Sequence, residues 1–109
     1  MEFMKHLPED PAKLADLIEI KPGRVVSMSL SKSECCQMMI MAVSQGEEVT
    51  EEEYPGDTFY LVLEGTMPLY RDGKRYDMNA GDTAVVPRGV GHAIGGAGDF
   101  KMLQIILTK

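Results

Sequence analysis

Short apolar stretches separated by polar turn residues fill most of the chain. Candidate strands lie at 17–20, 24–31, 37–44, 58–65, 83–87, 92–96 and 101–108, with Gly, Pro, Asp or Asn between them. No segment keeps a helical spacing of apolar residues long enough for a βαβ unit. This pattern predicts an all-β sandwich or barrel of about eight strands.

The first sixteen residues are the least strand-like part of the chain. Within "PEDPAKLADL", Asp10 is placed to cap one or two helical turns, and Pro11 would occupy the first helical position. A length of 109 residues fits one domain. We therefore expect an N-terminal extension over residues 1–16 and a single barrel domain over 17–109.

The residue pair Asp72-Gly73 stands between two strand-like runs, "MPLYR" and "KRYDM". Asp-Gly is favoured in two-residue type I′ hairpin turns, because both central positions need a positive φ. We therefore expect a tight hairpin at this point.

The strand expected at 58–65 is apolar on both faces, because side chains alternate along a strand. One face carries Thr58, Tyr60 and Val62, and the other Phe59, Leu61 and Leu63. A lone barrel has only one dry face, so the second face needs cover from the N-terminal segment or from another subunit. A homodimer is the simplest explanation.

The composition limits the classes of partner and the cellular locations that we expect for this chain. Eleven basic and seventeen acidic residues leave a net charge of −6, and no cluster of Lys and Arg is present, which argues against a nucleic-acid partner. No apolar run reaches the ~20 residues needed to span a membrane, and the first residues lack the apolar core of a signal peptide. Adjacent Cys35 and Cys36 would point to opposite faces of a strand, so we expect free thiols and a cytoplasmic location.

The stretch "GDTAVVPRGVGHAIGG", residues 81–96, has a specific spacing of turn residues. Gly81 would make a turn, Pro87 would end a strand, Gly89 would permit the next tight turn, and His92 would open the following strand. This arrangement resembles the second conserved motif of the cupin superfamily. The resemblance implies a cupin-type double-stranded β-helix, or jelly-roll, barrel.

The first cupin motif can be laid on "GEEVTEEEYPGDTFYLVLEG", with Gly46 and Gly65 as its end glycines. The family's two histidine positions then fall on Glu52 and Tyr54, and its glutamate position falls on Thr58. The resemblance covers roughly residues 24–107. The resemblance therefore supports the cupin fold for this chain more fully than it supports the family's metal-binding residues.

In metal-binding cupins, three histidines and a glutamate converge on one ion inside the barrel. Of these four positions only the last is matched here, by His92. Tyr54 and Thr58 replace good ligands, whereas the carboxylate at Glu52 still suits a divalent metal. The resemblance thus implies, at most, a weakly held Mn, Fe, Zn or Ni ion at Glu52 and His92.

In the register that the family implies, Glu52 and Tyr54 face the barrel interior. The alternative is that Glu52 belongs to a solvated acidic edge, because "EEVTEEE" is rich in acids. An inward carboxylate must be paired, metal-bound or protonated, and His92 is its obvious partner. Tyr60 on its own is as well explained by core packing.

The expected ligand-binding pocket is small and polar on apolar walls, as small-molecule sites are. Its candidate residues are Glu52, Tyr54, Thr58, Tyr60 and His92. Gln37 and Gln104 lie in apolar strands, so each must find partners or line a wet pocket. The sequence alone does not decide their register.

Three functions follow from this set of residues. In the first, the chain binds a small metabolite in the barrel pocket, either with a weakly held divalent metal or, as a non-catalytic binding or sensing module, without one. Alternatively, it is a metal-dependent oxygenase, isomerase or lyase acting on a small oxygenated metabolite. In the third, Glu52 and His92 form a metal-free acid–base pair. The catalytic candidates in either enzymatic case are Glu52 and His92.

Overall fold

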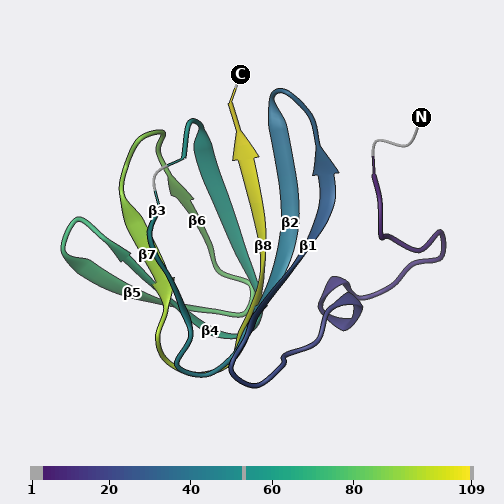
Figure 1. The fold of residues 1–109 in the computed structure, drawn as a ribbon, viewed down its shortest axis with the longest axis horizontal. Coiled ribbons are helices and arrows are strands. Elements are labelled where there is room, and N and C mark those ends of the chain that lie inside the picture. The colour runs from purple at the N-terminus through teal and green to yellow at the C-terminus, as the bar shows by residue number, and fades with distance from the viewer. Residues whose placement is uncertain (1–3, 53, 109) are drawn as a thin grey trace.

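The computed structural model describes residues 4–52 and 54–108, and for Glu51 and Glu52 only the backbone is described. One 3-10 helix precedes eight strands (Figure 1). The elements are η1 (Leu14–Leu17), β1 (Val25–Lys32), β2 (Cys36–Val43), β3 (Glu48–Glu52), β4 (Asp57–Arg71), β5 (Lys74–Asn79), β6 (Thr83–Val86), β7 (His92–Gly95) and β8 (Phe100–Leu107). The predicted all-β architecture is confirmed.

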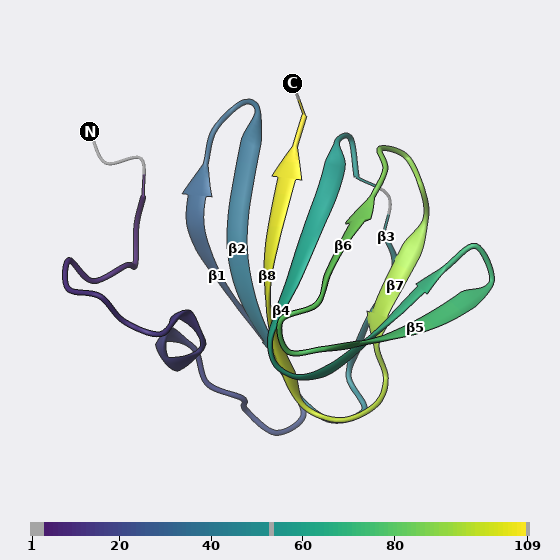
Figure 2. The same cartoon turned by 180° about the vertical axis from the view of Figure 1, so that it is seen from behind.

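The strands form one curled sheet in the order β1-β2-β8-β4-β7-β3, with β5 and β6 also paired to β4. The views from the front and from behind show this sheet bending round as a half-barrel (Figures 1 and 2). Strand β4 belongs to both halves of this curled sheet. Its first half pairs with β8 and β6, and its second half pairs with β5 and β7.

The bend in β4 has a local cause. Its register with β8 shifts between Val62 and Glu64, and the next residue, Gly65, has a φ of +76°. A bulge followed by a left-handed glycine turns the strand, so that one chain segment serves both halves of the sheet.

The concave face of the sheet carries the main core. On β4 the residues Thr58, Tyr60 and Val62 are at most 1% exposed, whereas Phe59, Leu61 and Leu63 are half-buried. The predicted assignment of side chains to the two faces of this strand is therefore confirmed. The core cluster consists of Val43, Tyr60, Val62, Met67, Leu69, Met78, Val86, Ile94, Phe100 and Met102.

The outer face is covered in part by the N-terminal segment. Ile18 is buried with Leu30, Ile40 and Ala42 of the sheet, and Leu17 packs against this cluster. The two opposite views place the segment beyond β1, away from β3 and β7 (Figures 1 and 2). Of the two covers expected for the second apolar face, the N-terminal segment supplies one for part of that face, and the homodimer stays a prediction.

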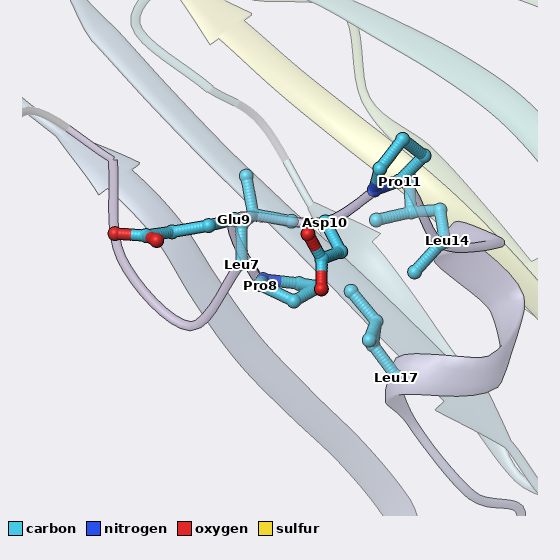
Figure 3. Close-up of a pocket in the computed structure, with 8 residues that line it drawn as sticks. Leu7, Pro8, Glu9, Asp10, Pro11, Leu14 and Leu17 are labelled. Carbon is cyan, nitrogen blue, oxygen red and sulfur yellow. The ribbon is translucent and has the colours of Figure 1, made fainter.

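The N-terminal elements themselves differ from the sequence prediction. Residues 17–20 do not form a strand, and the helix begins at Leu14 after Lys13, which makes no side-chain cap, rather than at Asp10 and Pro11. The apolar residues of this segment rest on the sheet instead of pairing with it. Figure 3 shows Leu14 and Leu17 of this segment around one pocket with Pro8, Asp10 and Pro11 of the preceding tail. A spacing of three between Leu14 and Leu17 suits a 3-10 turn laid on a surface.

The predicted hairpin is confirmed. Asp72 and Gly73 have φ values of 54° and 73°, and Arg71 pairs with Lys74 across the turn. Both central residues are therefore left-handed, as a type I′ turn requires.

Within the described ranges, no helix is long and apolar enough to cross a membrane. Cys35 and Cys36 are both free, as expected. The cytoplasmic location, and the division of the chain at residue 17, stay predictions.

Candidate functional site

His92 opens β7 and is 4% exposed. The turn before it is fixed by two backbone hydrogen bonds. Val90 N–H donates to the carbonyl of Pro87 (3.2 Å), and Gly89 N–H donates to the carbonyl of Tyr54 (3.1 Å). Gly89 has a φ of +76°, which a side chain would strain. The turn glycine therefore both aims His92 inward and ties its loop to the segment that carries Tyr54.

Both ring nitrogens of His92 are engaged. Nδ1 lies 3.1 Å from the carbonyl oxygen of Val90, and Nε2 lies 2.7 Å from the hydroxyl of Tyr60. A carbonyl oxygen only accepts, so Nδ1 carries the hydrogen of the neutral ring. The Tyr60 hydroxyl then donates to Nε2. This chain of two hydrogen bonds fixes the tautomer and the orientation of the ring.

Two tyrosine rings lie against the imidazole. The centroids of Tyr54 and Tyr60 are each 5.7 Å from that of His92, at interplanar angles of 57° and 68°. Tyr60 is 1% exposed and belongs to the core cluster, whereas Tyr54 is half-buried. The structure therefore brings three of the predicted pocket residues together, and Tyr60 serves both the core and the site.

Three further polar side chains lie on the same concave face. Thr58 is 1% exposed, and its Oγ1 has no hydrogen-bond partner within the part of the chain that the structure describes. Gln104 is 3% exposed and pairs with Tyr60 across β4 and β8. Gln37 pairs with Ile106, which in turn pairs with Thr58, so it lies in the same row. The register that the sequence left open is thereby settled: both amide residues belong to the concave face.

Glu52 is brought next to His92 in the backbone. The β3–β7 register runs Val49↔Ile94 and then, after a shift, Glu52↔His92. The shift inserts one extra residue into β3, which is a β-bulge. The side chain of Glu52 lies outside what the structure describes, so the prediction that its carboxylate faces the pocket stays a prediction.

Arg71 is a site residue that the sequence reasoning missed. It pairs with His92 across β4 and β7, and its Nη1 donates to the carbonyl of Val85 (2.8 Å). A pocket of about 300 Å³ is lined by both Arg71 and His92, together with Tyr70, Asp72, Gly73, Gly91 and Ala93. Strand alternation was the available clue, because Arg71 has the same parity on β4 as the buried Met67 and Leu69.

The described side chains do not fit a divalent-metal centre. The Nδ1–H···O=C bond of His92 is the orientation that metal-ligating histidines usually have, but its Nε2 is already taken by Tyr60. Tyr54 and Thr58 stand at two of the family's ligand positions, and neither is a good ligand for such an ion. Among the residues described, no group of three or more His, Cys, Asp or Glu side chains is placed to hold a metal.

Comparison with known proteins agrees with this fold. The family model of the cupin domain matches residues 39–107. A cupin superfamily protein from Desulfitobacterium hafniense shares 44% identity, with 97% of this chain and 98% of that chain covered and a TM-score of 0.93. A cupin 2 conserved barrel domain protein from Leptotrichia buccalis shares 35% identity over 86% of this chain and 46% of that chain, with a TM-score of 0.84.

A conserved protein of unknown function from Streptococcus pyogenes has the same fold at 22% identity, with a TM-score of 0.95 over 100% of this chain and 96% of that chain. None of the curated proteins compared with this chain matches it. The family match covers more than half of the chain, and the 44%-identical relative matches nearly all of it. This chain therefore belongs to the cupin family.

Proposed function

We propose that this cupin binds a small metabolite through hydrogen bonds at its concave face, without a metal ion. The observation that carries the proposal is the buried 2.7 Å hydrogen bond between Tyr60 and His92. It occupies the imidazole nitrogen that would otherwise face a metal. The two groups form instead a fixed polar pair on apolar walls, which is how small-molecule sites achieve orientation and specificity.

The orphaned hydroxyl of Thr58 supports a ligand at this face. A buried hydroxyl without a partner costs roughly 1–3 kcal/mol, so native proteins rarely keep one. Thr58 lies two residues before Tyr60 on the same face of β4. A bound molecule with a polar atom near Thr58 would satisfy it, and the nearby amide of Gln104 offers both donors and an acceptor.

The rival function is metal-dependent chemistry with Glu52 and His92 as protein ligands. Their cross-strand pairing is the observation in its favour. It requires Tyr60 to release Nε2 of His92, and it leaves the ion with only two protein ligands. A metal-free acid–base enzyme would use the same two residues, with proton transfer from Nε2 also competing with Tyr60.

A thermal-shift screen of small metabolites tests the proposal. The wild type is compared with Tyr60→Phe and Thr58→Val, each with and without a chelator. Thr66→Val is the matched control for Thr58→Val, because Thr66 is an exposed threonine of β4 that does not line the pocket beside His92. We expect compounds that stabilise the wild type and Thr66→Val but stabilise Tyr60→Phe and Thr58→Val less or not at all, with no effect of the chelator. Stabilisation that disappears with the chelator would overturn the proposal.

A further inference from the structure

Arg71 stands directly beside His92 at the end of β4. The β4–β7 register pairs the two residues, and the β3–β7 register continues the row to Glu52. Residues directly opposite each other in an antiparallel pair lie on the same face, with Cβ atoms about 5 Å apart. The row therefore places a permanent positive charge next to the proposed ligand site.

The guanidinium of Arg71 is held in place, but only some of its N–H groups have hydrogen-bond partners among the described residues. One N–H donates to the carbonyl of Val85, and the guanidinium carbon lies 5.6 Å from the ring centroid of Tyr76. Asp72 lies 3.8 Å from Nε and is 77% exposed, so this ion pair is a weak surface contact. A guanidinium has five N–H groups. Within the described residues, the other N–H groups of Arg71 have no hydrogen-bond partner.

Space for a ligand exists beside this charge. The pocket of about 300 Å³ is lined by Arg71 and His92, and three of its other residues, Gly73, Gly91 and Ala93, have little or no side chain. It adjoins the proposed site at His92, while Tyr60 and Thr58 lie behind that ring and do not line it. This volume lies at the lower end of the range for small-molecule sites. The occupant would therefore be a compound of few heavy atoms.

We infer that the ligand of this site is a small carboxylate, bound through its carboxylate group by Arg71 next to His92. The inference rests on the proposed function and names its ligand class. The planar guanidinium fork matches a carboxylate and is pre-oriented by Val85 and Tyr76. A neutral ligand would leave the guanidinium with only its weak surface contact to Asp72 as a charged partner.

The net charge of −6 does not oppose this assignment. At physiological ionic strength, charges more than about 8 Å apart are largely screened, whereas a contact between guanidinium and carboxylate is not. The acidic surface would slow the arrival of an anion more than it would weaken its final binding.

The test compares carboxylates with their uncharged amides by calorimetry and thermal shift. The pairs are succinate with succinamide and benzoate with benzamide, at one ionic strength set by sodium chloride. The variants are Arg71→Gln and Arg71→Lys. The matched control is Arg75→Gln, because Arg75 also lies beside a tyrosine ring (Tyr70, 5.8 Å) and an aspartate, but on the exposed β5.

We expect at least one carboxylate to bind more tightly than its amide. Arg71→Gln should weaken that binding roughly 10- to 100-fold, as loss of a charged hydrogen bond does. Arg71→Lys should keep the charge but lose the fork, and so weaken binding less. Arg75→Gln should bind as the wild type does. Each variant is first checked for folding by circular dichroism, and Arg71→Lys serves if Arg71→Gln does not fold.

Other outcomes separate the two proposals. Amides that bind as well as carboxylates, in a manner that needs Tyr60 but not Arg71, would overturn the carboxylate assignment and leave the proposed function standing. Phosphate that binds as tightly as the best carboxylate would also overturn it. Failure of every compound in the panel and in the wider metabolite screen would overturn both.

Discussion

Removal of one oxygen atom from Tyr60 tests the hydrogen bond on which the site is built. Tyr60→Phe deletes the hydroxyl that donates to Nε2 of His92 at 2.7 Å. Tyr60 is 1% exposed and His92 is 4% exposed, so water does not readily replace the lost group. The ring of Tyr60 stays in the core, and no large cavity forms.

The expected loss of stability comes from the unpaired nitrogen. A buried acceptor left without its donor costs roughly 1–3 kcal/mol. For a domain of about 100 residues, each kcal/mol lowers Tm by about 4 °C, so Tyr60→Phe should lower Tm by about 4–12 °C. The same change at Tyr70 should cost less than about 0.5 kcal/mol, because Tyr70 is only half-buried and lies on the other face of β4.

Urea unfolding followed by circular dichroism suits this protein, which contains no tryptophan. A cycle of Tyr60→Phe, His92→Leu and the double variant isolates the pair. We expect a coupling energy of about 1 kcal/mol or more, because the double variant leaves no unpaired nitrogen. A Tyr60→Phe variant as stable as the wild type, or a coupling energy of zero, would refute the argument that this pair is a buried, oriented hydrogen bond.

Three further predictions concern the core, the backbone and the assembly. Thr58→Val should raise the free energy of unfolding by about 1 kcal/mol, because it removes an unpaired buried hydroxyl. The same variant should weaken ligand binding in the thermal-shift screen. A variant less stable than the wild type would show that the hydroxyl is already satisfied. Gly65→Ala and Gly81→Ala both place a side chain at positive φ, which costs roughly 1–2 kcal/mol, but only at Gly65 would the new Cβ collide with a backbone carbonyl, that of Asp99. Urea unfolding should therefore show a much larger loss for Gly65→Ala, and equal losses would contradict the packing described for the bend. The homodimer stays a prediction: light scattering should give a dimer mass for the wild type and a monomer mass for Val85→Glu, since Val85 is 52% exposed on the outer face, and a monomeric wild type would exclude it.

Most of the barrel follows from patterns that are local in the sequence. The alternation at 58–65 predicted which residues of β4 are buried, and the Asp72-Gly73 pair predicted the hairpin. The motif around Gly89 and His92 predicted a turn that aims a histidine inward. These features depend on φ preferences and on side-chain parity, which a single segment determines.

The register of β3 depends on a partner strand and could not be derived in this way. Val49 packs against the core, and strict alternation from it would place Glu51 opposite His92. The bulge in β3 places the backbone of Glu52 there instead, while the inward direction of its side chain stays a prediction. Nothing in "EEVTEEE" marks the extra residue, because a bulge is defined by the mismatch between two strands.

The N-terminal segment was predicted wrongly, and Arg71 was overlooked, for a related reason. The alternation at 17–20 is typical of a strand. In the structure it serves instead to bury Ile18 against the outer face of the sheet. Arg71 ends an apolar strand just before a turn, where a solvated surface residue is the usual outcome. Only the pairing with His92 and the bond to Val85 show that it belongs to the site.

The metal content of the protein tests the central claim most directly. Untagged protein, purified without a chelator, is analysed by mass spectrometry beside Glu52→Ala and His92→Ala. The account predicts far less than one Mn, Fe, Zn or Ni ion per chain in the wild type, with no difference between it and the variants, because Tyr60 holds Nε2 of His92. Near-stoichiometric metal that both substitutions remove would contradict it, and would show that Glu52 and His92 form a metal site.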